Sequence, residues 1–182
     1  PGEVAVMAGE AEGVVARIEG SGEHGGIATA PVVHGAVRDG DCSACHSVHG
    51  GQHARLLRAV DPAVLTTPFD ARNYALCFSC HDSDLAREPN ATLFRDGQVN
   101  LHQTHLRSGD TSGSCRDCHA VHAGNQPRLI ADTVDYQDSG WVTPMGFVLT
   151  EDGGSCAPGC HEPLSYSRRA DPASPPQTGG SP

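Results

Sequence analysis

The sequence has no lysine, because all 12 of its basic residues are arginines. It is also poor in the side chains that form a hydrophobic core: aromatic residues make up 4% and hydrophobic residues 37% of its 182 residues. Glycine and proline are frequent instead, with 22 and 13 copies. Such a composition is typical of a loop-rich or partly disordered chain, so an ordinary apolar core does not account for a stable fold.

Two further absences bear on partners and location. No apolar stretch approaches the length of a membrane span, and the first residues, Pro1-Gly2-Glu3, do not form a signal peptide. Acidic residues outnumber basic ones and give a formal net charge of −10. This charge argues against nucleic acid as a partner and favours neutral or basic surfaces.

What the sequence does contain is eight cysteines, all of them in four motifs in which a histidine directly follows the second cysteine. The motifs are Cys42-Ser-Ala-Cys45-His46, Cys77-Phe-Ser-Cys80-His81, Cys115-Arg-Asp-Cys118-His119 and Cys156-Ala-Pro-Gly-Cys160-His161. In this pattern two thiols on one tight turn bond covalently to one porphyrin, while the histidine ligates its iron. A thioredoxin-like redox pair or half of a zinc site also contains paired cysteines, but neither requires that histidine each time.

The four motifs therefore predict four covalent c-type haems, and the fourth site is the least regular because one extra residue separates its cysteines. Haem also resolves the conflict in composition, since four apolar macrocycles cross-linked to the chain would replace the missing core. We expect a mostly irregular, loop-rich fold with short α-helices, in which the haems form the core, and poor folding without haem. The apolar segments Val4–Met7 and Val14–Ile18 predict a small N-terminal β-hairpin.

Along the chain we assign residues 1–30 to a head that contacts a neighbouring subunit, 31–98 to a first dihaem module, 99–169 to a second dihaem module, and 170–182 to a Pro/Gly-rich tail. Each module contains the same parts in the same order. An upstream histidine comes first, followed by a Cys-x-x-Cys-His-x-x-His segment, a spacer and a second attachment motif. The order indicates an internal duplication.

Histidine is abundant enough for two ligands on every iron. The expected proximal ligands are the motif histidines His46, His81, His119 and His161. The candidates for the four distal positions are His34, His49, His102, His105 and His122. We expect a solvated or structural role for His53, which has no counterpart in the second module. His24 is either a plain loop histidine or a ligand donated to the haem of another subunit.

The spacing of His49 and His122 decides which iron they can reach. Each follows a proximal histidine by three residues, so on a helical turn both side chains leave the same face, with Cβ atoms roughly 5–6 Å apart. The two axial ligands of one haem approach from opposite sides of a much wider disc. We therefore expect His49 and His122 to ligate a neighbouring haem.

With these residues in view, the chain resembles the doubled Cys-x-x-Cys-His family of multihaem cytochromes over about residues 31–168. The matching segments are His34–Gly50, Leu76–Asp82, Asn100–His105 and Gly153–His161. Proteins of this kind are electron-transfer cytochromes of anaerobic respiration. A tetrahaem subgroup is similar to extracellular cytochrome filaments, in which haems form a continuous chain through stacked subunits and a histidine of one subunit ligates a haem of the next.

The leading hypothesis is thus electron transfer by four low-spin bis-histidine haems, without enzymatic activity, in a subunit that polymerises into a conductive filament. The resemblance implies redox proteins or extracellular acceptors as partners, and haem attachment outside the cytoplasm implies an exported, extracellular or periplasmic protein. One alternative is a monomeric periplasmic shuttle. The other is a reductase of a small nitrogen or sulfur oxide, which needs one open iron. Without lysine, no haem is lysine-ligated as in multihaem nitrite reductases.

Overall fold

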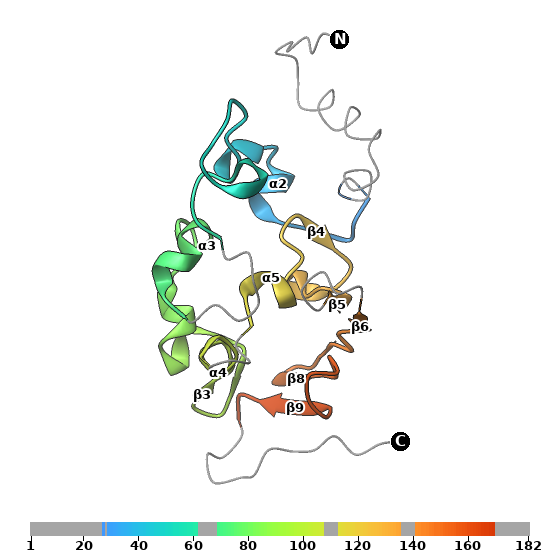
Figure 1. Ribbon diagram of the computed structural model, residues 1–182. Coiled ribbons are helices and arrows are strands. Elements are labelled where there is room, and N and C mark those ends of the chain that lie inside the picture. Colours follow the sequence, from blue (N-terminus) through green and yellow to red (C-terminus); the bar gives the residue numbers. More distant parts are fainter. Residues whose placement is uncertain (1–26, 28, 62–68, 108–112, 136–140, 170–182) are drawn as a thin grey trace.

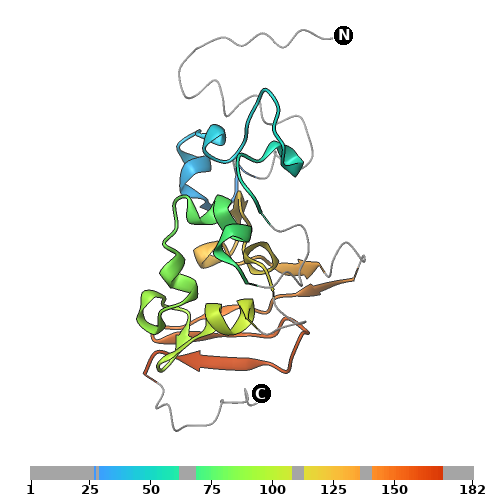
Figure 2. The same ribbon diagram turned by 60° about the vertical axis from the view of Figure 1, so that its left-hand side comes forward.

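The computed structural model describes residue 27 and residues 29–61, 69–107, 113–135 and 141–169. The hairpin expected in residues 1–30, His24 and the tail 170–182 lie outside the described residues. Within the described part, short helices and small sheets are joined by loops, which confirms the predicted loop-rich fold (Figures 1 and 2). From α2 at one end of the molecule the chain runs to α4 near the other end, returns to pair β4 with β1, and then runs back to the β8–β9 sheet (Figure 1).

The helices are one or two turns long. The α-helices are α2 (Gly35–Arg38), α3 (Ala75–Phe78), α4 (Leu101–Leu106) and α5 (Cys115–Cys118). The 3-10 helices are η1 (Cys42–Ala44), η2 (Ala54–Leu56), η3 (Ala71–Tyr74), η4 (Ser83–Ala86), η5 (Pro89–Ala91) and η7 (Pro127–Leu129). Polar side chains start several of them: the Asn100 amide oxygen accepts from the Gln103 backbone amide at 3.1 Å. Such caps satisfy the free amides of a first helical turn.

The strands form four small antiparallel sheets among the described residues, and the sequence analysis did not predict them. The two-stranded sheets pair β1 (Val32–Val33) with β4 (Ala123–Gly124), β2 (Arg95–Asp96) with β3 (Val99–Asn100), and β5 (Thr133–Asp135) with β6 (Val142–Pro144). The three-stranded sheet has the order β7 (Val148–Leu149), β8 (Gly153–Cys156) and β9 (Leu164–Ser167). The pairing of β1 with β4 joins segments from the two predicted modules.

Strand β8 approaches its neighbours so closely that two of its residues must be glycine. A Cβ atom on Gly153 would lie 1.8 Å from the Tyr166 carbonyl oxygen, and one on Gly154 would lie 2.6 Å from the Val148 carbonyl oxygen. Real Cβ atoms do not approach backbone so closely. The two glycines therefore allow the register that carries Cys156 at the end of β8.

The buried apolar core is small, as the composition predicts. It consists of Tyr74, Ala86 and Leu106, against which Phe69, Phe78, Leu85 and Cys115 pack. Tyr74 is completely buried. The cluster includes Cys115 of the third attachment motif and Phe78, which directly follows Cys77 in the second. It therefore brings these two motifs together. Among the described residues, no helix has the length and apolar character needed to cross a membrane.

The backbone around the first and third motifs follows the same course. The amide of Ser47 donates to the Leu56 carbonyl at 2.7 Å, and that of Ala120 to the Leu129 carbonyl at 2.8 Å. Likewise Arg58 donates to Cys45, and Ala131 to Cys118, both at 2.9 Å. Both copies contain an Arg-Leu pair with positive φ angles between 56° and 60°: Arg55 with Leu56, and Arg128 with Leu129. The repeat seen in the sequence thus extends to local backbone geometry, and it aligns His49 with His122.

Candidate haem sites

Each of the first three attachment motifs forms a single helical turn. The motif histidine donates its backbone amide to the carbonyl of the first cysteine: His46 to Cys42 at 3.0 Å, His81 to Cys77 at 3.0 Å, and His119 to Cys115 at 2.9 Å. This bond brings both thiols and the imidazole to one short stretch of backbone, as a c-type haem requires. The fourth motif is different, because Cys156 ends a strand and Cys160 follows Gly159, whose φ is 79°.

Each motif histidine faces one of the five predicted distal histidines. The ring centroids are 6.1 Å apart for His46 and His122, 6.0 Å for His81 and His34, 6.4 Å for His119 and His102, and 6.3 Å for His161 and His105. The four distances span only 0.4 Å although the pairs come from different elements. No two pairs share a residue, so the chain supplies two imidazoles for every attachment motif.

The separation of the paired rings fits a metal ion between them. Two imidazoles that bind one metal from opposite sides, each through a nitrogen at about 2 Å, have ring centroids roughly 6 Å apart. The donor set also fits, since paired histidine ligands and two adjacent thiols are what a c-type haem uses. Among the described residues, no group of three or more His, Cys, Asp or Glu side chains is placed to hold a metal ion.

Hydrogen bonds orient several of these imidazoles. The Nδ1 atom of His46 lies 2.9 Å from the Arg55 carbonyl oxygen, that of His119 lies 3.1 Å from Arg128, and that of His161 lies 2.6 Å from Glu162. On the distal side, the Nδ1 atom of His105 lies 2.7 Å from the Leu101 carbonyl oxygen. A carbonyl only accepts, so in each case Nδ1 carries the proton and donates it. The lone pair is then on Nε2, which is the nitrogen left to ligate iron.

The electrostatics of the third site keep its histidines neutral. Burial lowers the pKa of His102 to about 4, with smaller contributions from charge on His119 and His105. Burial also lowers the pKa of His119. The neutral imidazole is the form that ligates a metal, so both rings are in the ligating form at neutral pH before haem is attached.

The cysteines of successive motifs lie close to one another. The side chains of Cys77 and Cys115 hydrogen-bond each other. Burial raises the pKa of Cys45, and charge on Cys80 and Cys77 raises it further. Burial likewise raises the pKa of Cys118 to about 12, with added effects from Asp117, Cys156 and Cys160. The first motif is therefore adjacent to the second, the second to the third, and the third to the fourth.

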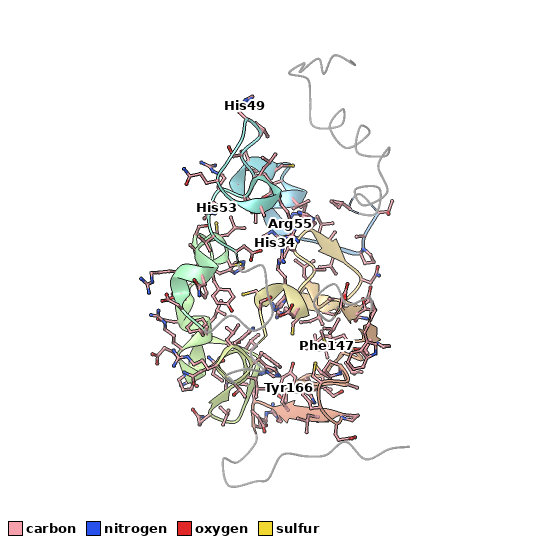
Figure 3. All side chains as sticks on the ribbon, viewed as in Figure 1. His34, His49, His53, Arg55, Phe147 and Tyr166 are labelled. Carbon is pink, nitrogen blue, oxygen red and sulfur yellow. The ribbon has the colours of Figure 1, made fainter. Side chains whose placement is uncertain are left out.

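Of the predicted ligands, the structure leaves His49 apart from the other histidines. It is exposed and lies at the tip of a loop at the α2 end of the molecule, away from His34 (Figure 3). Within the described residues His49 has no ring contact of the kind that joins the four pairs. His122, its counterpart in the repeat, lies beside His46 of a different motif. His53 also lies outside the four pairs.

Sequence reasoning missed the residues that orient the imidazoles. The Thr92 hydroxyl lies 2.9 Å from Nδ1 of His102, and the ring of Phe94 contacts both His102 and His105. The Arg55 and Arg128 carbonyls were detectable in principle, because the Arg-Leu pair recurs at the same place in both copies of the repeat. Nothing in the sequence pattern singles out Thr92 or Phe94.

Comparison with known protein families supports the attachment motifs of the first part of the chain. Residues 34–86 match the family described as the doubled CXXCH motif, a span that includes His34 and the first two attachment motifs. Neither a curated protein nor a solved structure matches the chain. Residues 34–86 thus carry the doubled CXXCH motif of multihaem c-type cytochromes, which attach haem covalently and transfer electrons.

Proposed function

We propose that the protein transfers electrons through four c-type haems, each held by two histidine ligands. The single observation that supports this best is the set of four imidazole pairs at 6.0 to 6.4 Å. The proposed ligand pairs are His46 with His122, His81 with His34, His119 with His102, and His161 with His105. When bound, a haem iron with two imidazoles supplies one-electron chemistry, and the protein sets its ligands, burial and hydrogen bonds.

We propose further that the four haem sites follow one another in the order of their motifs. The first two sites are joined by the backbone bond from His34 to His122 at 2.9 Å. Contact between Cys77 and Cys115 supports adjacency of the second and third. The third and fourth share helix α4, which carries both His102 and His105. Electrons would then enter at one end of the chain of sites and leave at the other.

An electron carrier fits these residues better than a reductase. Reduction of a small nitrogen or sulfur oxide needs an iron with an open position, and each motif histidine already faces a second imidazole. A second imidazole opposite each motif histidine supports a carrier, because an iron with two histidine ligands has no open position for a substrate.

The proposal extends to assembly: subunits associate end to end into an extracellular filament, as in the cytochromes that the sequence resembles. His49 supports this, because it occupies the repeat position of His122 and is exposed at the α2 end (Figure 3). Because the four motif histidines already face histidines of the same chain, His49 would serve there as a contact to a neighbouring subunit and not as a ligand to its iron. A monomeric periplasmic shuttle is the alternative, and the four intramolecular pairs favour it, since they leave no motif histidine without a partner.

Electron paramagnetic resonance of the oxidised holoprotein, together with its intact mass, tests the haem assignment. We expect a mass with four covalent haems and only low-spin signals typical of bis-histidine iron. A high-spin signal at neutral pH would contradict the proposed ligand pairs. A mass with three haems would leave electron transfer in place but remove the fourth site.

Particle mass measured over a range of protein concentrations tests the assembly. A filament subunit should grow in mass with concentration, and His49→Ala should abolish that growth. His53→Ala is the matched control, since His53 lies nearby in the same loop region but has no repeat counterpart. A mass that is monomeric at every concentration would favour the shuttle.

A further inference from the structure

Phe94 lies against both histidines of α4. Its ring centroid is 5.1 Å from that of His102, with the planes at 78°, and 5.6 Å from that of His105, with the planes at 24°. The first contact is edge-to-face and the second is stacked, which are the two arrangements that aromatic pairs favour. One phenyl ring therefore touches the proposed distal ligands of two different haems.

The position of Phe94 is itself fixed from several directions. Its backbone amide donates to the Thr92 hydroxyl at 3.0 Å, and its carbonyl accepts from the Leu101 amide at 3.0 Å. The Phe94 ring also contacts the Tyr166 ring edge-to-face, with ring centroids 5.0 Å apart. The Thr92 hydroxyl in turn contacts Nδ1 of His102 at 2.9 Å. Thr92, Phe94 and His102 thus form one connected unit.

This contact matters because the plane of an axial imidazole affects the iron it ligates. Rotation of the ring about the iron–nitrogen bond changes its overlap with the iron d orbitals, and so changes the electronic state and the reduction potential. His105 is exposed and His102 is half-buried, so neither ring is held by tight packing on all sides. A phenyl ring in contact with both limits the rotation of each.

We propose that Phe94 is a positioning residue that sets the imidazole planes of His102 and His105 and so tunes the third and fourth haems together. The proposal rests on the proposed function, because it takes these histidines as the distal ligands. Phe94 itself does not contact the iron. Its effect is exerted through the orientation of the two rings and is confined to two of the four sites.

The test compares Phe94→Leu with wild type by electron paramagnetic resonance and by redox titration of the oxidised tetrahaem protein. Leucine keeps an apolar side chain but cannot stack or present an aromatic edge. We expect two of the four low-spin signals to shift, the reduction potentials of two haems to change, and the other two haems to stay as in wild type. Phe94→Tyr keeps the ring and should restore the wild-type spectrum.

Phe69→Leu is the matched control. Phe69 stacks on Tyr74 with ring centroids 5.7 Å apart, in the core cluster. Because Phe69 contacts neither His102 nor His105 in a ring pair, its loss should lower thermal stability without shifting the third and fourth signals together. Four unchanged signals in Phe94→Leu, or equal shifts of all four, would overturn the proposal.

A second variant keeps the test decisive if Phe94→Leu does not accumulate with four haems. Thr92→Val removes the hydroxyl that contacts Nδ1 of His102 and accepts the bond from the Phe94 amide, so we expect the signals of the third and fourth haems to shift while the other two stay as in wild type. Shifts of all four signals would overturn the proposal in that case too. Failure of the proposed function itself would be visible earlier, as a wild-type spectrum without four bis-histidine signals.

Discussion

The backbone amide of His34 donates a hydrogen bond of 2.9 Å to the carbonyl oxygen of His122. The bond continues the pairing of β1 with β4, in which Val33 lies opposite Ala123. Because His34 faces His81 and His122 faces His46, this one bond links the proposed distal ligands of the first two sites. A ligand for each site comes from a distant part of the chain, so the sites are expected to form only as the two halves fold together.

The repeat offers a matched pair of variants for the ligand assignment. His122→Ala removes the imidazole that faces His46, so we expect one of four haems to become high-spin, with a corresponding change in its visible and magnetic resonance spectra. His49→Ala alters the equivalent position of the first copy, where no motif histidine lies opposite. The spectrum of that variant should match wild type at low protein concentration. A high-spin haem in His49→Ala and none in His122→Ala would reverse the assignment.

The left-handed backbone at Arg55 is expected to lower the reduction potential of the haem at the first site. Its φ of 56° directs the residue 55 carbonyl to Nδ1 of His46 at 2.9 Å. A hydrogen bond from Nδ1 makes the imidazole a stronger donor to the metal. Valine tolerates positive φ poorly, whereas glycine adopts it freely. Redox titration should therefore show a raised reduction potential for one haem in Arg55→Val. In Arg55→Gly all the potentials should stay as in wild type.

The same comparison at the other copy of the repeat provides the control. Arg128→Val should raise the potential of a different haem, the one that we propose His119 ligates, because the Arg128 carbonyl lies 3.1 Å from its Nδ1. Glycine at either position should also stabilise the fold by roughly 0.5–1 kcal/mol, since it removes the steric cost of a left-handed side chain. Equal effects of valine and glycine on the potentials would contradict the hydrogen-bond explanation.

Features that depend on residues close together in the sequence were predictable, whereas contacts between segments far apart in the sequence were not. The local pattern of Cys42, Cys45 and His46 is enough to predict one turn that presents two thiols and an imidazole. Low aromatic content was enough to predict the small core and loop-rich fold. The pairing of His34 with His81 or of His122 with His46 depends on the β1–β4 contact, and two-residue strands leave no periodic signal in a sequence.

The site residues divide in the same way. Five distal candidates were identifiable because histidine is the expected ligand, and the repeat related His49 to His122. Which of them face a motif histidine was not predictable, since five candidates compete for four distal sites and only the fold selects among them. Phe94 and Thr92 were missed because a loop phenylalanine and threonine carry no spacing rule; their importance comes from where the chain returns beside α4.

The ion pair between Arg116 and Asp61 is expected to stabilise the contact of the second and third motifs. Its atoms lie 3.1 Å apart, and the Asp61 side chain is only 4% exposed. Burial raises the pKa of Asp61, and the Arg116 charge opposes this. Arg116→Met would leave a buried carboxylate unpaired, which costs about 3–5 kcal/mol in other proteins. Chemical denaturation of the holoprotein at neutral pH measures the loss.

Two controls separate this effect from a general loss of charge. Arg38 pairs with Asp39 on the surface, with side chains 70% and 67% exposed, so Arg38→Met should cost less than about 1 kcal/mol. The double variant Asp61→Asn with Arg116→Met removes both charges and should recover most of the stability. An equal loss in the Arg38 and Arg116 variants would contradict the role of the buried pair.

Tyr74 should make the protein less stable in alkaline solution. Burial raises the pKa of this phenol from 10.0 to about 12, because the fold disfavours the phenolate. The unfolded chain then loses the proton near pH 10 and the folded chain only near pH 12, so stability is constant below this window and falls as pH rises through it. Tyr74→Phe removes this titrating phenol and its contribution to the pH dependence of stability. Denaturation of the holoprotein at several pH values should show a shallower fall in the variant.

The same substitution has a second expected effect at neutral pH. The Tyr74 hydroxyl is buried and has no hydrogen-bond partner among the described residues. Removal of an unsatisfied buried polar group is neutral or stabilising, by about 1 kcal/mol, because its desolvation cost disappears. Tyr166→Phe is a second test of the alkaline effect. Burial also raises the pKa of Tyr166, so this variant should likewise lose stability less steeply as pH rises. A Tyr74→Phe protein that is less stable at neutral pH would indicate that the hydroxyl gains a partner once haem is attached.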